Sequence, residues 1–204
     1  MNRKEHWERI YQDKSPFEVS WYQKEPAVSL ALMRKLVLKN TDYIIDVGGG
    51  ASMFCDYLLK DGFKNITILD LSFHALTYVQ QRLGDKSKLI EWKVADVTNF
   101  VSSHKYDLWH DRAVFHFLTD NDDRKKYRQA LEASVKDYGH VIIAAFSIGG
   151  PTKCSGLDIV QYDAKTLKEE LGEKFILIEE KVEKHLTPVG KEQSFGYYVF
   201  TKNT

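Results

Sequence analysis

The chain is poor in the residues that build disulfide-linked or metal-held scaffolds. It has only two cysteines, Cys55 and Cys154, and neither belongs to a Cys-x-x-Cys pair. Two cysteines are too few for the disulfide frameworks that stabilise small secreted domains. A His-Glu-x-x-His motif is also absent, and zinc ligands usually lie close together in a sequence. We therefore expect free thiols and no metal site.

Long apolar runs are missing as well. Charged residues interrupt every hydrophobic stretch well before the roughly 20 apolar residues that a membrane helix needs. The opening residues, MNRKEHW, have no apolar segment behind their basic residues and do not resemble a signal peptide. From these absences we expect a cytoplasmic protein that does not bind a membrane.

Neither sign of charge is in excess. The 29 basic and 29 acidic residues cancel to a net charge of +0. A protein that binds nucleic acid through a broad phosphate-attracting field carries an excess of positive charge. The balance disfavours a nucleic acid as the partner.

Nothing in the sequence divides it into separate units. The four prolines are dispersed, and neither a repeat nor a low-complexity segment is present. The 204 residues, of which 43% are hydrophobic and 13% aromatic, are suited to one folded domain with a sizeable core. We predict a single domain that spans residues 1–204.

Short apolar runs alternate with segments of helical periodicity through most of the chain. Helices are predicted where apolar residues recur every three or four positions, and strands where β-branched and aromatic residues cluster between turn signals. The predicted helices are 27–38, 53–61, 73–83 and 122–135, and the strands that alternate with them are 43–47, 66–70, 88–94, 106–109 and 139–146. Such alternation is typical of an α/β fold with a mostly parallel sheet and helices on both faces.

The end of the chain breaks this alternation. Two β runs, 175–182 and 194–201, are separated by a loop that contains Pro188 and Gly190 and no helix. Consecutive strands without a crossover helix pair antiparallel. We therefore predict a terminal β-hairpin.

The strongest functional signal is a glycine-rich turn between a strand and a helix, residues 46–52 (DVGGGAS). Glycines there let the backbone turn sharply and approach a ligand closely. The next two strands also end in acids, Asp70 and Asp96. At the carboxyl edge of a parallel sheet, Asp70 can accept hydrogen bonds from ribose hydroxyls and Asp96 from an adenine amino group. The alternatives are a tight connection without a ligand and, for Asp70, an acid at the start of a helix.

The turn fits neither of two common nucleotide motifs. Counting from Gly48, the last position of a Gly-x-Gly-x-x-Gly dinucleotide motif is Met53, and no Gly-Lys-Ser/Thr P-loop occurs. The pattern Asp-x-Gly-x-Gly-x-Ser instead resembles motif I of the class I S-adenosylmethionine-dependent methyltransferases, with Ser52 in place of the usual third glycine. The resemblance covers nearly the whole chain, through Asp70, Asp96, residues 106–112 and residues 135–140, where Asp137-Tyr138-Gly139 replaces the frequent Pro-Gly-Gly but keeps a turn.

This resemblance implies a Rossmann-like sheet of seven strands in the order 3-2-1-4-5-7-6, mostly parallel, with the last strand antiparallel beside the fifth. It also implies S-adenosylmethionine as the cofactor. Residues 1–40 become an N-terminal lid and helix, 41–150 the cofactor-binding core, and 151–204 a substrate-side loop with the terminal hairpin. The residues that the resemblance assigns to the cofactor are Trp21, Asp46, Gly48, Gly50, Asp70, Leu71, Asp96, Val97 and Asp111.

The segments 6–11 (HWERIY) and 20–23 (SWYQ) resemble the lids of two methyltransferase subgroups. One subgroup methylates thiopurines and related small molecules, and it shares an Asp-Arg after the fourth strand and the later Asp-Arg-x-x-Tyr at 123–127. The other methylates protein lysines and carries Asp-x-Gly-Thr, where this chain has Asp-Arg-Ala-Val at 111–114. The aromatic residues of both segments have an alternative interpretation as a cluster that packs the first helix onto the core.

We therefore expect a small-molecule acceptor with a nitrogen, oxygen or sulfur nucleophile. A protein lysine is the alternative acceptor, and a non-catalytic adenosine-ligand scaffold or sensor is the alternative of another class. The chain is expected to act as a monomer or a homodimer.

Methyl transfer to an amine, hydroxyl or thiol requires that the acceptor lose a proton, and a positioned side chain can take it. Asp111 and His116, just beyond the fourth strand, are the candidate catalytic residues, although His116 is equally well a core residue. Tyr22, Arg112 and Cys154 are the candidate substrate-binding residues. Arg112 is suited to hold an acidic substrate through a forked contact, or alternatively to pair with the acids at 120–123.

Overall fold

The computed structural model describes residues 2–204, and its sheet has the predicted order. The seven strands run β3-β2-β1-β4-β5-β9-β8, with β1 (Tyr43–Val47), β2 (Asn65–Asp70), β3 (Ile90–Val94), β4 (Tyr106–Arg112), β5 (Val135–Phe146), β8 (Phe175–Leu186) and β9 (Glu192–Lys202). The first five strands are parallel, and β9 is antiparallel to both β5 and β8. Two short strands, β6 (Lys153–Cys154) and β7 (Leu157–Asp158), pair with each other outside this sheet, so β9 and β8 are the expected seventh and sixth strands.

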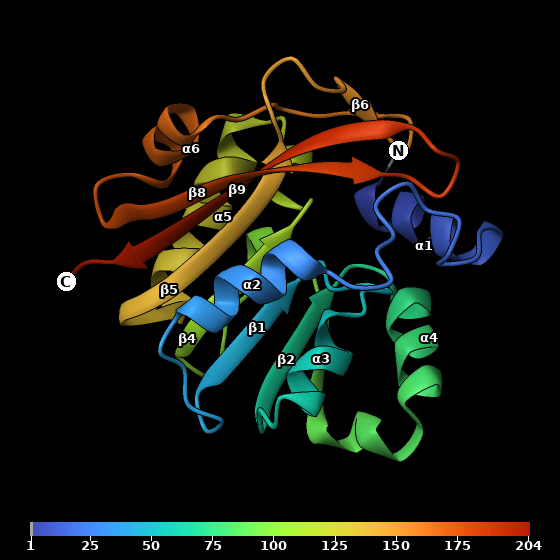
Figure 1. The fold of residues 1–204 in the computed structure, drawn as a ribbon, viewed down its shortest axis with the longest axis horizontal. Coiled ribbons are helices and arrows are strands. Elements are labelled where there is room, and N and C mark those ends of the chain that lie inside the picture. Colours follow the sequence, from blue (N-terminus) through green and yellow to red (C-terminus); the bar gives the residue numbers. More distant parts are fainter. Residues whose placement is uncertain (1) are drawn as a thin grey trace.

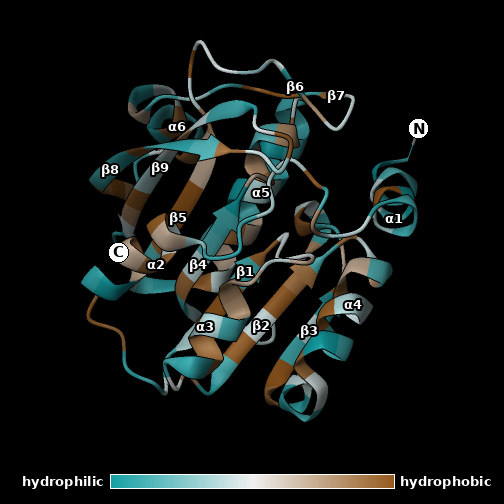
Figure 2. Ribbon diagram, turned by 45° about the vertical axis from the view of Figure 1, so that its right-hand side comes forward, coloured by the Kyte–Doolittle hydropathy of each residue, from teal (hydrophilic) through white to brown (hydrophobic). Residues whose placement is uncertain are grey.

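Helices cover both faces of the sheet (Figure 1). Successive strand residues point to opposite faces, and the side chains of β1 divide in this way between two apolar clusters. Ile44 belongs to the cluster with α2 (Ala27–Lys35), α3 (Phe54–Lys60) and α4 (Phe73–Leu83), and Ile45 to the cluster with α5 (Asn121–Ser134) and α6 (Ala164–Leu171). Figure 2 shows that β2 is predominantly hydrophobic, as expected for a strand that is covered on both faces.

Several boundaries differ from the predicted ones. The strand expected at 88–94 begins at Ile90, because residues 84–89 form the 3₁₀ helix η1 (Gly84–Leu89). The helix expected at 27–38 ends at Lys35, where the following residue is already extended. The fourth strand continues to Arg112 instead of ending at Trp109, because its ladder with β5 extends to Ala144.

The turn predicted at 137–139 lies inside β5. Tyr138 has a positive φ of 64°, and the ladder between β4 and β5 changes register between Tyr106 and Leu108. The predicted turn is therefore an irregularity within β5, and this strand begins at Val135, directly after α5.

Two helices were not predicted from periodicity. The first, α1 (Arg3–Asp13), is capped by Asn2, whose side chain accepts a hydrogen bond from the Lys4 backbone N–H. The second, α6, begins with a capping box between Asp163 and Thr166. Only two of the eight residues of α6 are buried, so its apolar pattern is too short to stand out.

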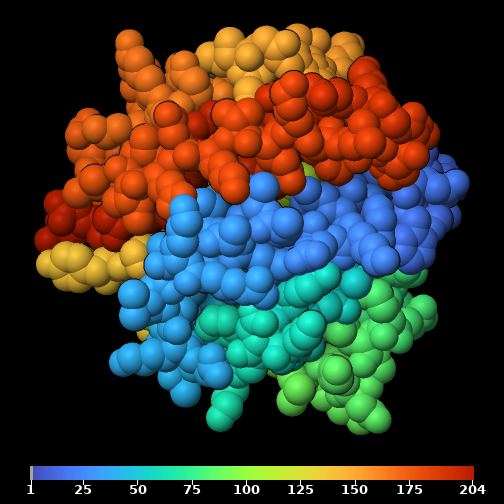
Figure 3. Space-filling view, viewed as in Figure 1, coloured from blue at the N-terminus to red at the C-terminus, as the bar shows by residue number. Residues whose placement is uncertain are grey.

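The segment that precedes α2 lies across the carboxyl ends of the central strands. Figure 3 shows it (blue) between the β8–β9 hairpin (orange to red) and the helices α3 and α4 (teal and green). Gln23 donates to Glu183 on β8 at 2.8 Å, and His185 lies 2.7 Å from the Ser20 carbonyl oxygen. On the other side, the Ser72 hydroxyl before α4 donates to Glu8 of α1 at 2.8 Å. The N-terminal segment is thus tied to both halves of the sheet.

No helix within residues 2–204 combines the length and the apolar character that crossing a membrane requires.

Candidate functional site

Two adjoining cavities lie under the N-terminal segment, at the carboxyl edge of the sheet. The first is a concave site that is partly open to solvent. Its lining includes Arg3, Trp7 and Tyr11 of α1 and the ends of β1, β2 and β4. The second is lined by Asp46, His110, the glycine turn and residues of the segment between α1 and α2. Four residues line both cavities: Tyr11, Trp21, Gly48 and Arg112.

The glycine turn is shaped for close approach. Gly48 has a φ of +65°, and a Cβ atom there would lie 1.9 Å from a methyl group of Val114. A Cβ atom on Gly50, where φ is +40°, would lie 2.8 Å from the Tyr11 hydroxyl and 2.9 Å from Asp70 Oδ2. Both positions therefore require glycine, for conformation and for space.

Asp70 and Leu71 line the first cavity, and the ribose-binding role of Asp70 stays a prediction. The Asp70 carboxyl accepts hydrogen bonds from the backbone N–H groups of Ser72, at 2.8 Å, and of Gly50. Burial raises the pKa of Asp70 to about 7, with a further rise from the neighbouring Asp46 and Glu8, although the two hydrogen bonds oppose it. The carboxyl is thus poised between its neutral and charged forms near neutral pH.

Asp96 and Val97 also line the first cavity, and their adenine-binding role stays a prediction. Oδ1 of Asp96 accepts from the N–H and the hydroxyl of Thr98, at 2.9 and 2.8 Å. Oδ2 lies 3.3 Å from the guanidinium of Arg3, which also reaches Asp123 at 3.1 Å. The first helix is therefore clamped to the acid expected to bind the adenine.

Glu8 fastens the same helix to the start of α4. Its carboxylate accepts from the backbone N–H groups of Phe73 and His74 and contacts the His74 ring at 2.8 Å. Burial by itself raises the pKa of Glu8, but the contacts with His74, Phe73 and Ser72 outweigh it and lower the pKa to about 2. A carboxylate at a helix N-terminus is favourable because the free N–H groups and the helix dipole attract negative charge.

Asp46 lies on β1 with one oxygen bound and one free. Oδ1 is 2.7 Å from Nδ1 of His110, and Oδ2 is buried with no hydrogen-bond partner among residues 2–204. Leaving a buried acceptor unpaired costs about 1–3 kcal/mol, and more when it is charged. Asp46 also lines the second cavity.

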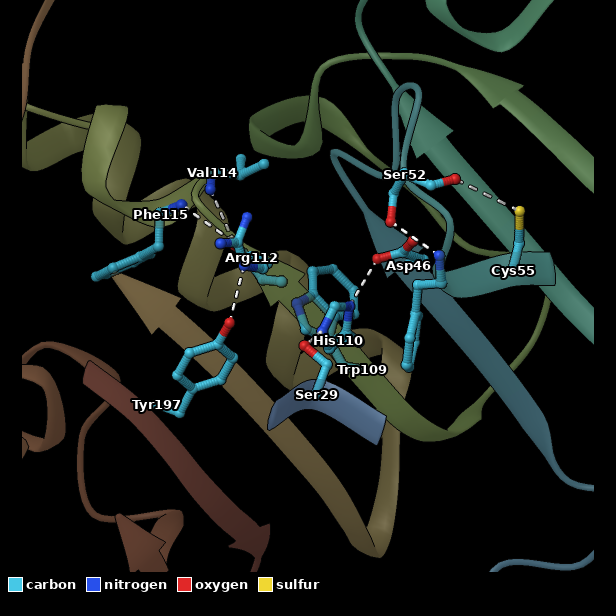
Figure 4. A network of polar contacts seen from close by, with 12 residues as sticks. Ser29, Asp46, Ser52, Cys55, Trp109, His110, Arg112, Val114, Phe115 and Tyr197 are labelled. Carbon is cyan, nitrogen blue, oxygen red and sulfur yellow. Dashed lines mark hydrogen bonds and ion pairs between the residues drawn. The ribbon is translucent and has the colours of Figure 1, made fainter. Parts of the chain in front are cut away.

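Arg112 does not pair with the acids at 120–123, so that alternative is wrong. Its Nε donates to the Tyr197 hydroxyl at 2.8 Å (Figure 4), and its Nη1 donates to the Trp21 carbonyl at 2.9 Å. The guanidinium lies 4.6 Å from the centre of the Phe195 ring, and Glu183 is the acid within ion-pair range, at 3.7 Å. Arg112 is in register with Ala144 of β5, which is itself paired with Tyr197 of β9, so the Arg112 side chain reaches β9 across β5. Within residues 2–204, the buried Nη2 has no hydrogen-bond partner.

Asp111 points away from the cavities. Its carboxylate accepts from the Tyr127 hydroxyl at 2.7 Å and from the N–H groups of Val114 and Phe115, at 2.9 and 3.4 Å. Burial raises its pKa to about 6, against these hydrogen bonds. The contacts hold the turn after β4, in which Ala113 has a φ of 73°. The catalytic and cofactor-binding roles of Asp111 stay predictions that this geometry does not support.

His116 lies in 3₁₀ helix η3 (Phe115–Phe117) and is fully buried. Its ring stacks on Phe146, and its Nδ1 accepts from the Phe146 backbone N–H at 3.3 Å. Burial, with a smaller contribution from Arg112, lowers the pKa of His116 to about 3. His116 lines neither cavity, so its core alternative fits the structure better, and its role as a base stays an untested prediction.

The three candidate substrate residues separate in space. Tyr22 and Arg112 both line the second cavity. Cys154 is buried beside Ser20, with 4.0 Å between Sγ and the hydroxyl oxygen, and it lines neither cavity. Burial raises the pKa of its thiol.

Three site residues were not predicted: His110, Arg3 and Glu8. His110 could have been found by pairing the strands, because β1 and β4 set it directly opposite Asp46. Arg3 and Glu8 carry no such signal, since their partners belong to distant elements. Among residues 2–204, no group of three histidines, cysteines or acids is arranged to hold a metal ion.

Comparison with known proteins gives matches in sequence and in fold. A family model described as a methyltransferase domain matches residues 45–143. Malonyl-[acyl-carrier protein] O-methyltransferase 1 of Ilyobacter polytropus is 33% identical over 144 residues, 69% of this chain and 50% of that protein. The chain thus spans about half the length of this relative.

Two solved structures illustrate the similarity in fold. N-methyltransferase NodS of Bradyrhizobium japonicum, solved with S-adenosylhomocysteine, superposes with a TM-score of 0.75 over 100% of both chains at 16% identity. The 1,6-didemethyltoxoflavin-N1-methyltransferase of Burkholderia thailandensis, also solved with S-adenosylhomocysteine, superposes with a TM-score of 0.73 over 98% of this chain and 87% of that one, at 16% identity. Together with the sequence matches, this shared fold confirms the resemblance, and the chain belongs to the class I S-adenosylmethionine-dependent methyltransferase family.

Proposed function

We propose that this chain transfers a methyl group from S-adenosylmethionine to a small-molecule acceptor through a nitrogen, oxygen or sulfur nucleophile, and releases S-adenosylhomocysteine. One observation carries the proposal: Asp46 and Arg112 both line the second cavity, and among residues 2–204 their buried Oδ2 and Nη2 atoms have no hydrogen-bond partner, although Nη2 is 3.7 Å from the Glu183 carboxylate. An ammonium and a carboxylate, the two charges of an amino acid, are their complements. S-adenosylmethionine has such an end joined to an adenosine.

The first cavity supports binding of the adenosine. Asp70 is placed to accept from the ribose hydroxyls and Asp96 from the adenine amino group, while Val97 offers a backbone N–H. Apolar and aromatic side chains, among them Trp7 and Phe117, line the same space and suit a flat base. The two cavities together match the two ends of the cofactor.

Bound S-adenosylmethionine supplies a methyl group that is already activated by a sulfonium charge. In the transfer, the acceptor nucleophile forms a bond to the methyl carbon while the carbon–sulfur bond breaks. The electron pair of that bond stays on sulfur, and the acceptor loses its proton. The chain contributes alignment and the exclusion of water, which supply a large part of such a rate enhancement. Tyr11 and Trp21, which line both cavities, are placed to do this at their junction.

The nature of the acceptor bears on the need for a base. The side chains of Asp111 and His116 do not reach the cavities. An acceptor that is already ionised at neutral pH, such as a carboxylate, needs no base in the site. The name of the Ilyobacter relative describes O-methylation of a malonyl group, which is acidic. We therefore extend the proposal to an acidic acceptor.

The way the site is closed favours a small acceptor over a protein lysine. Trp21, Tyr22 and Gln23 line the second cavity from the segment that His185 and Glu183 tie to β8.

The single domain, with its lid at 1–40, its core at 41–150 and its substrate-side loop and hairpin at 151–204, is part of this proposal.

Transfer of a labelled methyl group into cell lysate, separated into protein and small-molecule fractions, tests the proposal. We expect label in the small-molecule fraction, absent with the Asp70→Ala control. Label in protein would support the lysine alternative, and label in neither fraction would support a non-catalytic scaffold.

A further inference from the structure

The carboxylate of Asp46 is held so that its two oxygens have different surroundings. Oδ1 receives the His110 ring nitrogen at 2.7 Å, whereas the buried Oδ2 has no hydrogen-bond partner among residues 2–204. A Cβ atom on Gly49 would lie only 2.8 Å from Oδ2, so the glycine leaves the space that this oxygen occupies. Asp46 and Gly49 both line the second cavity.

The His110 ring is fixed on three sides. Nδ1 meets Asp46, Nε2 lies 2.8 Å from the hydroxyl of Ser29 on α2, and the ring stacks on Phe54 of α3 with 4.1 Å between centroids (Figure 4). An ionised carboxylate only accepts hydrogen bonds, so Nδ1 carries a proton and donates to Oδ1. Strand pairing sets His110 opposite Asp46, so both side chains stand on the same face of the sheet.

These contacts determine where the free oxygen points. A carboxylate turns readily about its last torsion, and a single fixed donor on one oxygen restrains that rotation. Ser29 and His110 are almost fully buried, so water does not compete for the ring.

We propose that His110 is a positioning residue, which holds Oδ1 of Asp46 so that Oδ2 faces the second cavity and receives the ammonium group of the ligand's amino acid end. The inference rests on the proposed function, since that ligand is S-adenosylmethionine. Asp46 makes the contact, and His110 acts through it.

A purely structural role for His110 is the competing explanation. The ring also joins β4 to α2 through Ser29, so its loss would loosen the fold. Two substitutions separate the two roles. The amide nitrogen of asparagine lies as far along the side chain as Nδ1, and that of glutamine as far as Nε2. His110→Asn therefore keeps a donor for Asp46 and loses Ser29, whereas His110→Gln does the reverse.

The experiment measures dissociation constants of S-adenosylhomocysteine and of 5′-methylthioadenosine, which has the adenosine and the sulfur but no amino acid end. In His110→Gln we expect affinity for S-adenosylhomocysteine to fall roughly tenfold, while that for 5′-methylthioadenosine changes less than about twofold. His110→Asn should restore most of the loss. Ser29→Ala, which keeps the bond between Asp46 and His110, should leave the ratio of the two constants unchanged.

The outcomes are distinct. Equal losses for both ligands in His110→Gln, or a changed ratio in Ser29→Ala, would overturn the positioning role while leaving the proposed function intact. A native chain that binds neither ligand would refute the proposed function and this inference with it. If both His110 variants fail to fold, a changed ratio in Ser29→Ala would still overturn the positioning role.

Discussion

The Arg3 guanidinium of α1 lies 3.3 Å from the Asp96 carboxylate, at the end of the first cavity where adenine is expected. Glu8 of the same helix binds the start of α4, beside Asp70. The helix is thus tied at two points to the loops that carry the proposed cofactor acids. A ligand under it can exchange only when these contacts open.

Replacing Arg3 by glutamine should therefore speed the exchange of ligand. The variant loses the ion pairs with Asp96 and Asp123, so α1 opens more often, and both the association and the dissociation rates of S-adenosylhomocysteine should rise severalfold. Stopped-flow fluorescence measures both rates. Because the ion pairs are partly exposed, the free energy of unfolding should change by less than about 1 kcal/mol. Unchanged rates would show that Arg3 does not hold the helix closed.

Binding of S-adenosylhomocysteine should depend on the charge of Asp70. Burial raises the pKa of this carboxyl to about 7, and ribose hydroxyls bind best to its ionised form. Affinity should therefore rise from about pH 6 to about pH 8, since the proton must leave for the ligand to bind. In Asp70→Asn it should be low and independent of pH over that range. Calorimetry across this range measures the effect, and the same slope in both proteins would contradict it.

The same carboxyl gives a stability effect of opposite sign. Without ligand, the folded protein holds the Asp70 proton more tightly than the unfolded chain does, between the ordinary pKa of 3.8 and about 7. The contribution of Asp70 to the free energy of unfolding should therefore fall as pH rises through this window. Urea unfolding at several pH values should show a smaller fall in Asp70→Asn, which serves as the control.

The glycine turn should tolerate no side chain at Gly48. A Cβ atom would lie 1.9 Å from Val114 on a backbone with positive φ, so Gly48→Ala should lower the free energy of unfolding by about 3 kcal/mol. Gly84 is a matched control, because its φ is also positive but no atom lies within 4 Å of its Cβ position. Gly84→Ala should cost only about 1 kcal/mol in chemical denaturation. Equal losses would show that the contact with Val114 relaxes freely.

Substitution of Arg112 tests whether this residue binds the carboxylate of the cofactor. If its free Nη2 binds the carboxylate of the cofactor, Arg112→Lys should weaken S-adenosylhomocysteine about tenfold and 5′-methylthioadenosine much less. We expect this result from calorimetry with the two ligands. Tyr197→Phe is the control, since it removes the contact at Nε and leaves the guanidinium in place. Unchanged affinity for both ligands in Arg112→Lys would show that Arg112 does not bind the carboxylate of the cofactor.

The parallel sheet and its edge acids were predictable from the alternation of strands and helices along the chain, whereas the strand order was implied by the family resemblance. Parallel strands all end at the same edge of a sheet, so Asp46, Asp70 and Asp96 were expected close together there. The direction of a side chain was predictable only where the strand's extent was right. The fourth strand was predicted to end at Trp109, so the alternation that turns Asp111 away from His110 and Arg112 could not be applied.

The remaining site features depend on contacts between distant segments. His110 and Asp46 are 64 residues apart, and no periodicity links them. The burial of His116 depends on Phe146, and that of Cys154 on where the segment around Ser20 lies. Such contacts follow from tertiary packing rather than from local pattern.

Calorimetry with S-adenosylmethionine and with NAD, on the native chain, tests the central claim most directly. The account predicts heat of binding with S-adenosylmethionine and none with NAD, because the glycine turn has Met53 where a dinucleotide motif needs its last glycine. Binding of NAD without binding of S-adenosylmethionine would contradict it.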